Sequence, residues 1–154
     1  MNTDNFSYTE SNKVTEVING NYPKDLYRAL LNAKEDDTDR LYKASSLANA
    51  ICKVWGVPAI TIHILGHRQE IQRGFAKGQR YGFYAQKGAG LDTYISLYNY
   101  TAKTHKIVSI KSFADTLLHE MIHHYDINVL KLAHTPHTSG FYQRIGDLKK
   151  RLEN

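Results

Sequence analysis

The run from residue 112 to residue 126 constrains this chain more than any other stretch. It carries an apolar stripe at helical spacing, formed by Phe113, Leu117, Leu118, Met121, Ile122 and Tyr125. This spacing predicts a half-buried helix. Ser112, followed three residues later by Asp115, is typical of a capped helix start. Such a helix needs a core to pack against, and 154 residues are enough for one domain with a core.

The same helix carries the pattern H-E-x-x-H at residues 119–123. Residues four apart lie one turn above each other, about 40° apart around the helix axis. His119 and His123 can therefore bind one metal ion, as in zinc peptidases. Glu120 lies on the neighbouring edge of that face, where a carboxylate can act on a water molecule bound to the metal. The sequence thus predicts a Zn²⁺ site with Glu120 as its catalytic residue.

A catalytic zinc ion usually has three protein ligands and one water molecule, so a third ligand is expected. In the extended pattern H-E-x-x-H-x-x-G-x-x-H, positions 126 and 129 would be glycine and histidine, and neither is. A glutamate ligand is also disfavoured, because the only glutamate after Glu120 is Glu153 near the end of the chain. His134 and His137 remain, in a loop that can fold back onto the site. We favour His137 over His134.

Three further residues near the motif have two interpretations each. Asp126 either orients a ligand histidine or is a solvated carboxylate at the end of the helix. Tyr125 and Tyr142 are candidates to stabilise an oxyanion by their proximity in sequence alone, with core packing as the alternative reading.

The remaining patterns predict helices around a small sheet. Residues 25–34 and 141–152 have helical periodicity, and so do residues 39–54, with Thr38 as N-cap and Gly56 past the last turn. Residues 59–65, 81–86 and 93–98 read as strands, and 66–78 as a loop or irregular hairpin. His63 points away from the isoleucines of its strand. Short strands with tight connections favour an antiparallel three-stranded sheet, so the expected fold class is α+β.

Composition sets the remaining expectations. Residues 1–21 are polar and are expected to be a flexible N-terminal arm, with one domain at residues 22–154. Cys52 is the only cysteine, which excludes a cysteine-based zinc ribbon. The first ten residues lack an apolar signal core and no run is long enough to span a membrane, so we expect the cytoplasm and no membrane partner. A net charge of +5 permits contact with nucleic acid without establishing it.

The segment Leu117-Leu118-His119-Glu120-Met121-Ile122-His123 resembles the active-site helix of SprT-like metalloproteases, the family that includes Spartan. In that family the third ligand is a histidine in a following loop, with a phenylalanine four residues after it, and His137 and Phe141 fit this spacing. The family usually has glycine directly after this histidine, where this chain has Thr138. The order of elements over residues 39–152 is also similar. The resemblance implies a zincin-like fold without the zinc ribbon that members commonly carry.

The resemblance also implies a function, namely zinc-dependent cleavage of proteins bound or crosslinked to DNA. A basic aromatic hairpin could contact DNA through phosphate contacts and base stacking, and we define it as Arg68, Arg73, Phe75, Lys77, Arg80, Tyr81, Phe83, Tyr84 and Lys87. The alternative for the hairpin is a solvated surface with a buried aromatic face. The alternatives for the protein are a zinc peptidase with a specific protein substrate and no DNA role, or a non-proteolytic DNA-binding module on a zincin scaffold.

Overall fold

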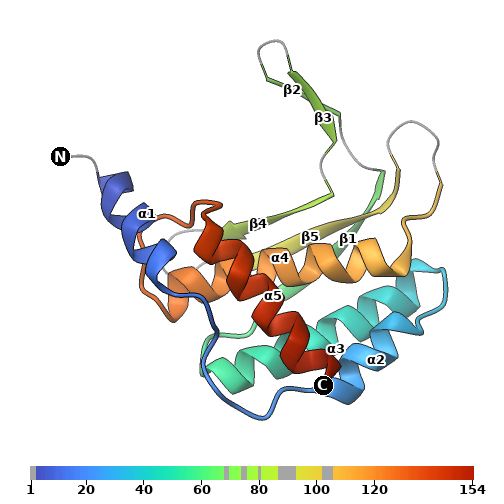
Figure 1. Cartoon of the computed structure of the whole chain (residues 1–154). Coiled ribbons are helices and arrows are strands. Elements are labelled where there is room, and N and C mark those ends of the chain that lie inside the picture. Colours follow the sequence, from blue (N-terminus) through green and yellow to red (C-terminus); the bar gives the residue numbers. More distant parts are fainter. Residues whose placement is uncertain (1–2, 68–69, 74–75, 80, 87–92, 102–105) are drawn as a thin grey trace.

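The computed structural model describes residues 3–67, 70–73, 76–79, 81–86, 93–101 and 106–154. The chain is α+β, as predicted (Figure 1). The helices are α1 (Thr3–Lys13), α2 (Lys24–Leu31), α3 (Asp37–Trp55), α4 (Ile110–Asn128) and α5 (Ser139–Glu153). The strands are β1 (Thr61–His67), β2 (Glu70–Arg73), β3 (Ala76–Gln79), β4 (Gly82–Gln86) and β5 (Thr93–Tyr100).

The main sheet has three strands in the order β1-β5-β4. β5 pairs antiparallel with β4, as expected, but parallel with β1, where Thr61 lies opposite Tyr94. The prediction of an antiparallel sheet is therefore wrong, and the sheet is mixed. A parallel pair needs a connection that returns the chain to the same end of the sheet. The segment between β1 and β5, which includes the antiparallel pair β2 and β3 and then β4, makes that return.

The helices pack on one face of this sheet. Ile62, Ile95 and Leu97 point to that face, are almost fully buried, and join a core with apolar residues of α2, α3, α4 and α5. α3 contacts β1, whereas α4 contacts β4 and β5. Among the described helices, none combines the length and the apolar character that crossing a bilayer requires.

The other face of the sheet carries aromatic side chains. The ring of Phe83 contacts the rings of Tyr94 and Tyr98, and Tyr94 also contacts His63. His63 is exposed, so its predicted orientation away from the isoleucines of its strand is confirmed. The alternation of side chains along each strand thus places Ile62, Ile95 and Leu97 on the inner face and Phe83, Tyr94 and Tyr98 on the outer face.

The residues that cap α3 and α4 differ from those predicted. Asp36, not Thr38, caps α3, because its side chain accepts a hydrogen bond from the Asp39 N–H. Ser109 caps α4 in the same way by accepting from the Ser112 N–H. A cap residue must lie just before the first helical turn, in a non-helical conformation. Each helix begins earlier than predicted, so the capping position shifts toward the N-terminus.

The other end of α3 follows the prediction. Gly56 has φ of 68° at the C-cap, a left-handed conformation that favours glycine.

Asp115, the expected partner of Ser112 in capping α4, instead forms an ion pair with Lys149 of α5 at 3.0 Å.

The N-terminal segment packs against the body of the domain, where the sequence suggests a flexible arm. α1 contacts α5, and Ser7, Ser11 and Val17 are each at most 4% exposed. The backbone N–H of Val17 donates to the Asp147 carboxylate at 2.9 Å. Serine hydroxyls and backbone groups make most of these contacts, which is why a polar composition did not reveal them.

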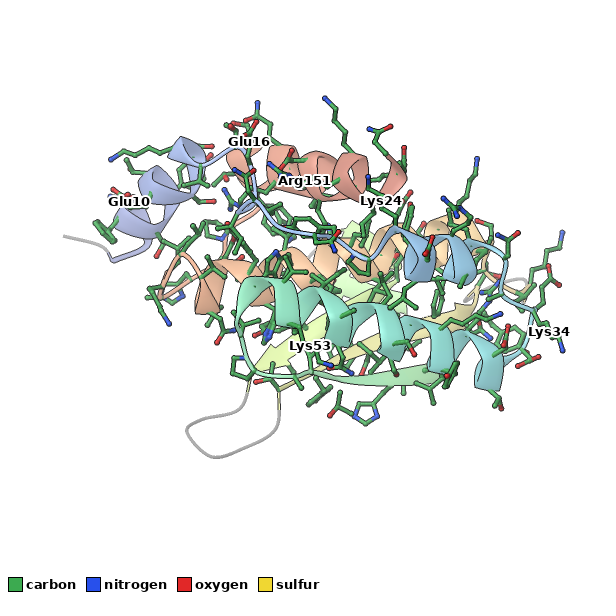
Figure 2. The ribbon with its side chains drawn as sticks, turned by 90° about the horizontal axis from the view of Figure 1, so that it is seen from below. Glu10, Glu16, Lys24, Lys34, Lys53 and Arg151 are labelled. Atoms are coloured by element: carbon green, nitrogen blue, oxygen red, sulfur yellow. The ribbon has the colours of Figure 1, made fainter. Side chains whose placement is uncertain are left out.

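The helical side of the molecule has a surface of mixed charge. Figure 2 shows acidic and basic side chains around α1, α2, α3 and α5, and those labelled are Glu10, Glu16, Lys24, Lys34, Lys53 and Arg151. Glu10 pairs with Lys13, and Arg151 pairs with Asp147 on its own helix. The labelled residues of this side thus carry both signs of charge.

Candidate metal centre

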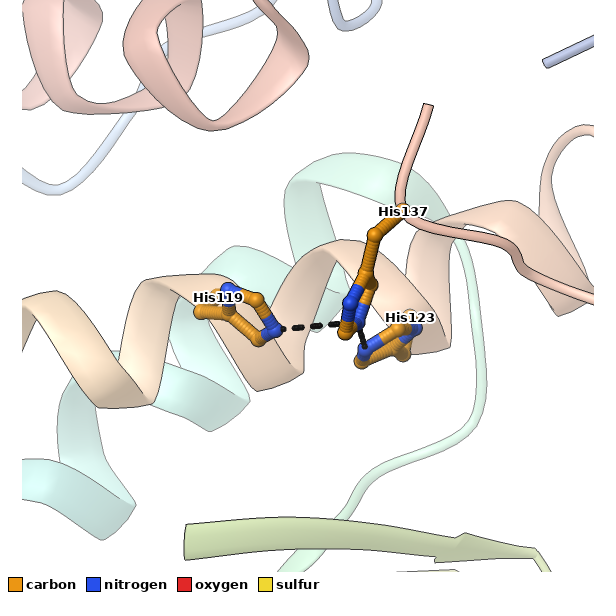
Figure 3. A group of neighbouring side chains, drawn as sticks. All are labelled: His119, His123 and His137. Carbon is orange, nitrogen blue, oxygen red and sulfur yellow. Dashed lines mark hydrogen bonds between the residues drawn. The ribbon is translucent and has the colours of Figure 1, made fainter. Parts of the chain in front are cut away.

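Three histidines converge at the middle of α4. His119 and His123 lie one turn apart on this helix, and His137 comes from the loop that joins α4 to α5 (Figure 3). The Nε2 atom of His137 lies 3.3 Å from Nε2 of His119 and 3.1 Å from Nε2 of His123. Tetrahedral coordination at the usual Zn–N bond length places ligand nitrogens about 3.3 Å apart. The three histidines are therefore compatible with a metal ion, and their candidate ligand atoms all lie within 4.8 Å of one another.

The imidazoles of this cluster are held in their neutral form. Burial, with the nearby His137, lowers the pKa of His119 to about 4. Burial, together with His119 and His137, lowers the pKa of His123 to about 3. Burial also lowers the pKa of His137. A histidine must be neutral to offer a lone pair to a metal ion, so the cluster presents three nitrogen donors at neutral pH.

The start of α5 fixes the third histidine. Thr138 directly follows His137 and caps α5, because its hydroxyl accepts from the Phe141 N–H at 3.0 Å. The fully buried ring of Phe141 lies against all three imidazoles, with centroids 5.0 Å from His119, 4.6 Å from His123 and 5.0 Å from His137. The cap and the aromatic wall together orient the loop histidine toward α4.

The Glu120 carboxylate lies beside the cluster. Its Oε1 atom is 4.0 Å from Nε2 of His123, and its side chain is only 8% exposed. The carboxylate thus faces the same side of α4 as the nitrogen donors. A base in this position can reach a water molecule held between the histidines.

His134, the alternative third ligand, does not belong to the cluster in the described part of the chain. Its backbone N–H donates to the Ser7 hydroxyl at 3.3 Å.

Of the two tyrosines considered for an oxyanion, Tyr125 is buried and its hydroxyl accepts from the Ile18 N–H, so it packs in the core. Tyr142 is 53% exposed, and its ring centroid lies 5.9 Å from that of His137. Tyr142 is therefore at the rim of the site.

His124, the neighbour of His123, has a structural role. It is buried, its Nε2 lies 3.0 Å from the Pro58 carbonyl oxygen, and its Nδ1 lies 3.0 Å from the Tyr84 hydroxyl. These contacts link α4 to β4 and to the segment that precedes β1. Burial lowers the pKa of His124, which favours its neutral ring.

Sequence reasoning missed Thr135 and Arg144, which lie behind the cluster. Nδ1 of His123 is 2.8 Å from the Thr135 hydroxyl, and that hydroxyl donates to the Asp126 carboxylate at 2.8 Å. Arg144 pairs with the same carboxylate, and both side chains of the pair are fully buried. Burial raises the pKa of Asp126, and Arg144 and Thr135 oppose that shift. The available signal was Arg144 itself, a cation three residues after Phe141 on the apolar face of its helix.

The basic aromatic hairpin is described only in part. Tyr81 is 48% exposed, and Phe83 lies on the aromatic outer face of the sheet. Tyr84 points inward, because its hydroxyl contacts His124 of α4. Arg73 lies in β2 and Lys77 in β3. Four members lie outside the described residues, namely Arg68, Phe75, Arg80 and Lys87.

Comparisons with known proteins found no match for this chain. No protein-family model matches this chain, and neither a curated protein nor a solved structure matches it.

Proposed function

We propose that this chain is a zinc-dependent endopeptidase of the SprT-like type. The observation that carries the proposal is the convergence of three histidine nitrogens within 4.8 Å of one another, with the Glu120 carboxylate beside them. A purely structural zinc site needs no carboxylate at that position, so the arrangement favours hydrolysis over a non-proteolytic binding module.

His119, His123 and His137 would hold the ion. When bound, zinc supplies a Lewis acid that polarises a water molecule and the scissile carbonyl group. Glu120 accepts the proton of the attacking water molecule and passes it to the nitrogen of the leaving amine. The side chain of Glu120 is only 8% exposed and Phe141 is fully buried, so electrostatic interactions of the Glu120 carboxylate are stronger than they would be in water.

The proposed substrate is a protein bound or crosslinked to DNA. The net charge of +5 and a pI of about 9.2 support attraction to a polyanion. The exposed Tyr81 and the basic residues of the hairpin are the proposed contacts with a DNA strand. A peptidase that recognises one protein without DNA is the second candidate, and DNA dependence of cleavage separates the two.

The first test is the zinc content of the purified protein, measured by elemental mass spectrometry. We expect about one zinc ion per chain in the wild type, from the three-histidine ligand set. His137→Ala should lose most of the zinc, and His134→Ala, the matched control, should retain it. Zinc retained in His137→Ala but lost in His134→Ala would move the third ligand, and a wild type that binds no zinc would refute the metal site.

The second test is cleavage of a DNA-bound protein and of an unstructured protein, each with and without single-stranded DNA. We expect Glu120→Gln to keep its zinc and its DNA affinity but to lose turnover by several orders of magnitude, because the base is gone. Cleavage that DNA does not stimulate, with no DNA affinity at low salt, would favour the second candidate. Undiminished cleavage by Glu120→Gln would exclude the proposed mechanism.

A further inference from the structure

A chain of hydrogen bonds runs from the metal centre into the interior of the protein. It begins at Nδ1 of His123, the ring nitrogen opposite the candidate ligand atom, and passes through the Thr135 hydroxyl to the Asp126 carboxylate. Both distances are 2.8 Å. Thr135 lies in the same loop as His137, so the loop contributes a ligand to the cluster and a partner to a second ligand.

The direction of these hydrogen bonds fixes the tautomer of His123. The carboxylate of Asp126 can only accept, so the Thr135 hydroxyl donates its single hydrogen to it. The same hydroxyl can then only accept from His123, whose Nδ1 must carry the proton. A neutral imidazole protonated at Nδ1 has its lone pair on Nε2, which is the atom that faces His119 and His137.

The far end of the chain is anchored by Arg144. Its Nε donates to Oδ1 of Asp126 at 3.1 Å, and its Nη2 donates to Oδ2 at 2.9 Å. Nη1 donates to the carbonyl oxygens of Ser11 and Val14, each at 2.6 Å, and Nη2 also donates to the Ser11 hydroxyl at 2.8 Å. This two-point contact prevents rotation of the carboxylate, and the N-terminal segment in turn holds the guanidinium group.

The same segment reaches the loop of the third ligand. The Ser11 hydroxyl lies 2.8 Å from the hydroxyl of Thr138, the residue after His137. The Asn12 side chain accepts from the Ser139 hydroxyl at 3.0 Å and from the Gly140 N–H at 3.2 Å. Residues 11–14 therefore connect to two of the three histidines, to His123 through Arg144 and to His137 through the start of α5.

We infer that Thr135 and Asp126 are positioning residues of the metal centre, that they fix the tautomer and ring orientation of His123, and that Arg144 and residues 11–14 hold them in place. The inference rests on the metal site of the proposed function. The inference also gives the N-terminal segment a role. The segment contributes no ligand, but its hydrogen bonds to Arg144 and to the start of α5 help to hold His123 and His137 in place.

The test compares Thr135→Val, which removes the hydroxyl, with Thr135→Ser, which keeps it. The matched control is Thr116→Val on α4, where the partly buried hydroxyl donates only to the Ser112 carbonyl oxygen at 2.8 Å. Zinc affinity is measured on full-length protein by competition with a chelator, and the coordination geometry is read from the visible spectrum of the Co²⁺-substituted protein. Thermal unfolding without metal verifies that each variant folds, and Thr135→Ala replaces Thr135→Val should the valine not fit.

We expect Thr135→Val to bind zinc about 10–100-fold more weakly than the wild type and to have an altered Co²⁺ spectrum, as for other residues that orient metal ligands. Thr135→Ser and Thr116→Val should match the wild type in both measurements. Zinc affinity and a Co²⁺ spectrum unchanged in Thr135→Val would overturn the positioning role and leave the metal site intact. A wild type that binds neither ion would overturn the metal site itself, and this inference with it.

Discussion

At the scale of single residues, Gly140 marks the closest approach between α5 and the N-terminal segment. A Cβ atom at this position would lie 2.3 Å from the Ser11 carbonyl oxygen and 2.9 Å from Cα of Asn12, and both contacts are with backbone atoms. Gly146, six residues further along the same helix, has open space around it. A side chain thus has no room at Gly140 but has room at Gly146.

We therefore predict opposite effects of two alanine substitutions on the free energy of unfolding. Gly140→Ala should destabilise the protein by about 1–3 kcal/mol, because the backbone of residues 11–12 must move away. Gly146→Ala should stabilise it by about 0.5–1 kcal/mol, because alanine loses less conformational entropy in a helix. Urea unfolding of both variants measures the difference, and a Gly140→Ala variant as stable as the wild type would contradict the packing of the N-terminal segment.

Two arginines on otherwise apolar helix faces show how single residues can reveal tertiary contacts. Arg40 of α3 and Arg144 of α5 are almost fully buried. Arg40 donates to Asn99 of β5 at 2.7 Å and lies over the ring of Phe113. Burial of a cation is costly unless it is paired, so a cation in an apolar stripe predicts a buried acceptor, although the stripe does not identify it.

At the scale of elements, a serine cap begins α4, the helix that carries two histidines of the candidate metal site. Ser109 has the non-helical backbone of an N-cap, and its side chain accepts from the Ser112 N–H at 3.2 Å. Ser112 lies within the first turn, where its carbonyl oxygen accepts from the Thr116 hydroxyl. The cap satisfies one of the unpaired N–H groups at the end of the helix that carries His119 and His123.

Ser109→Ala should accordingly lower the free energy of unfolding by about 0.5–2 kcal/mol, the usual effect of removing an N-cap. Ser112→Ala, the change at the cap expected from sequence, should alter it by less than about 0.5 kcal/mol. Chemical denaturation of the two variants side by side tests the assignment. A larger loss in Ser112→Ala than in Ser109→Ala would show that the helix begins at the later residue.

At the scale of the whole molecule, the proposed metal site joins parts of the chain that are distant in sequence. α4 carries two histidines of the cluster, and the following loop carries the third. The N-terminal segment contacts Arg144 and Thr138, which lie behind His123 and next to His137. In the unfolded chain these groups are not held together. A metal ion that binds only the folded state should therefore stabilise the entire domain.

Zinc at about 100 times its dissociation constant should raise the free energy of unfolding by about 2.7 kcal/mol. For a chain of this size, this corresponds to an increase in melting temperature of roughly 5–11 °C. Calorimetry with and without zinc measures the shift, and a chelator should reverse it. His119→Ala should show almost none of the increase, and His134→Ala should show all of it. An equal increase in His119→Ala would mean that zinc acts elsewhere on the protein.

The sequence by itself determined the features that depend on local spacing. The helical period of the sequence predicted α3, α4 and α5 close to their observed bounds. Strand patterns did the same for β1, β4 and β5. The four-residue spacing of His119 and His123 and the loop position of His137 identified the three histidines that the fold brings together. These features could be predicted because side-chain direction in a helix or strand follows from the position along the element alone.

The tertiary structure decided what depends on partners distant in the chain. The parallel pairing of β1 with β5, the packing of residues 3–21 and the link from His123 through Thr135 and Asp126 to Arg144 all join distant segments. Hydrogen bonds between such segments leave no period in the sequence, and a polar residue that finds a buried partner looks the same as one that stays in solvent. Burial in the folded chain distinguishes the two, because a polar group in the interior costs free energy unless it is hydrogen-bonded.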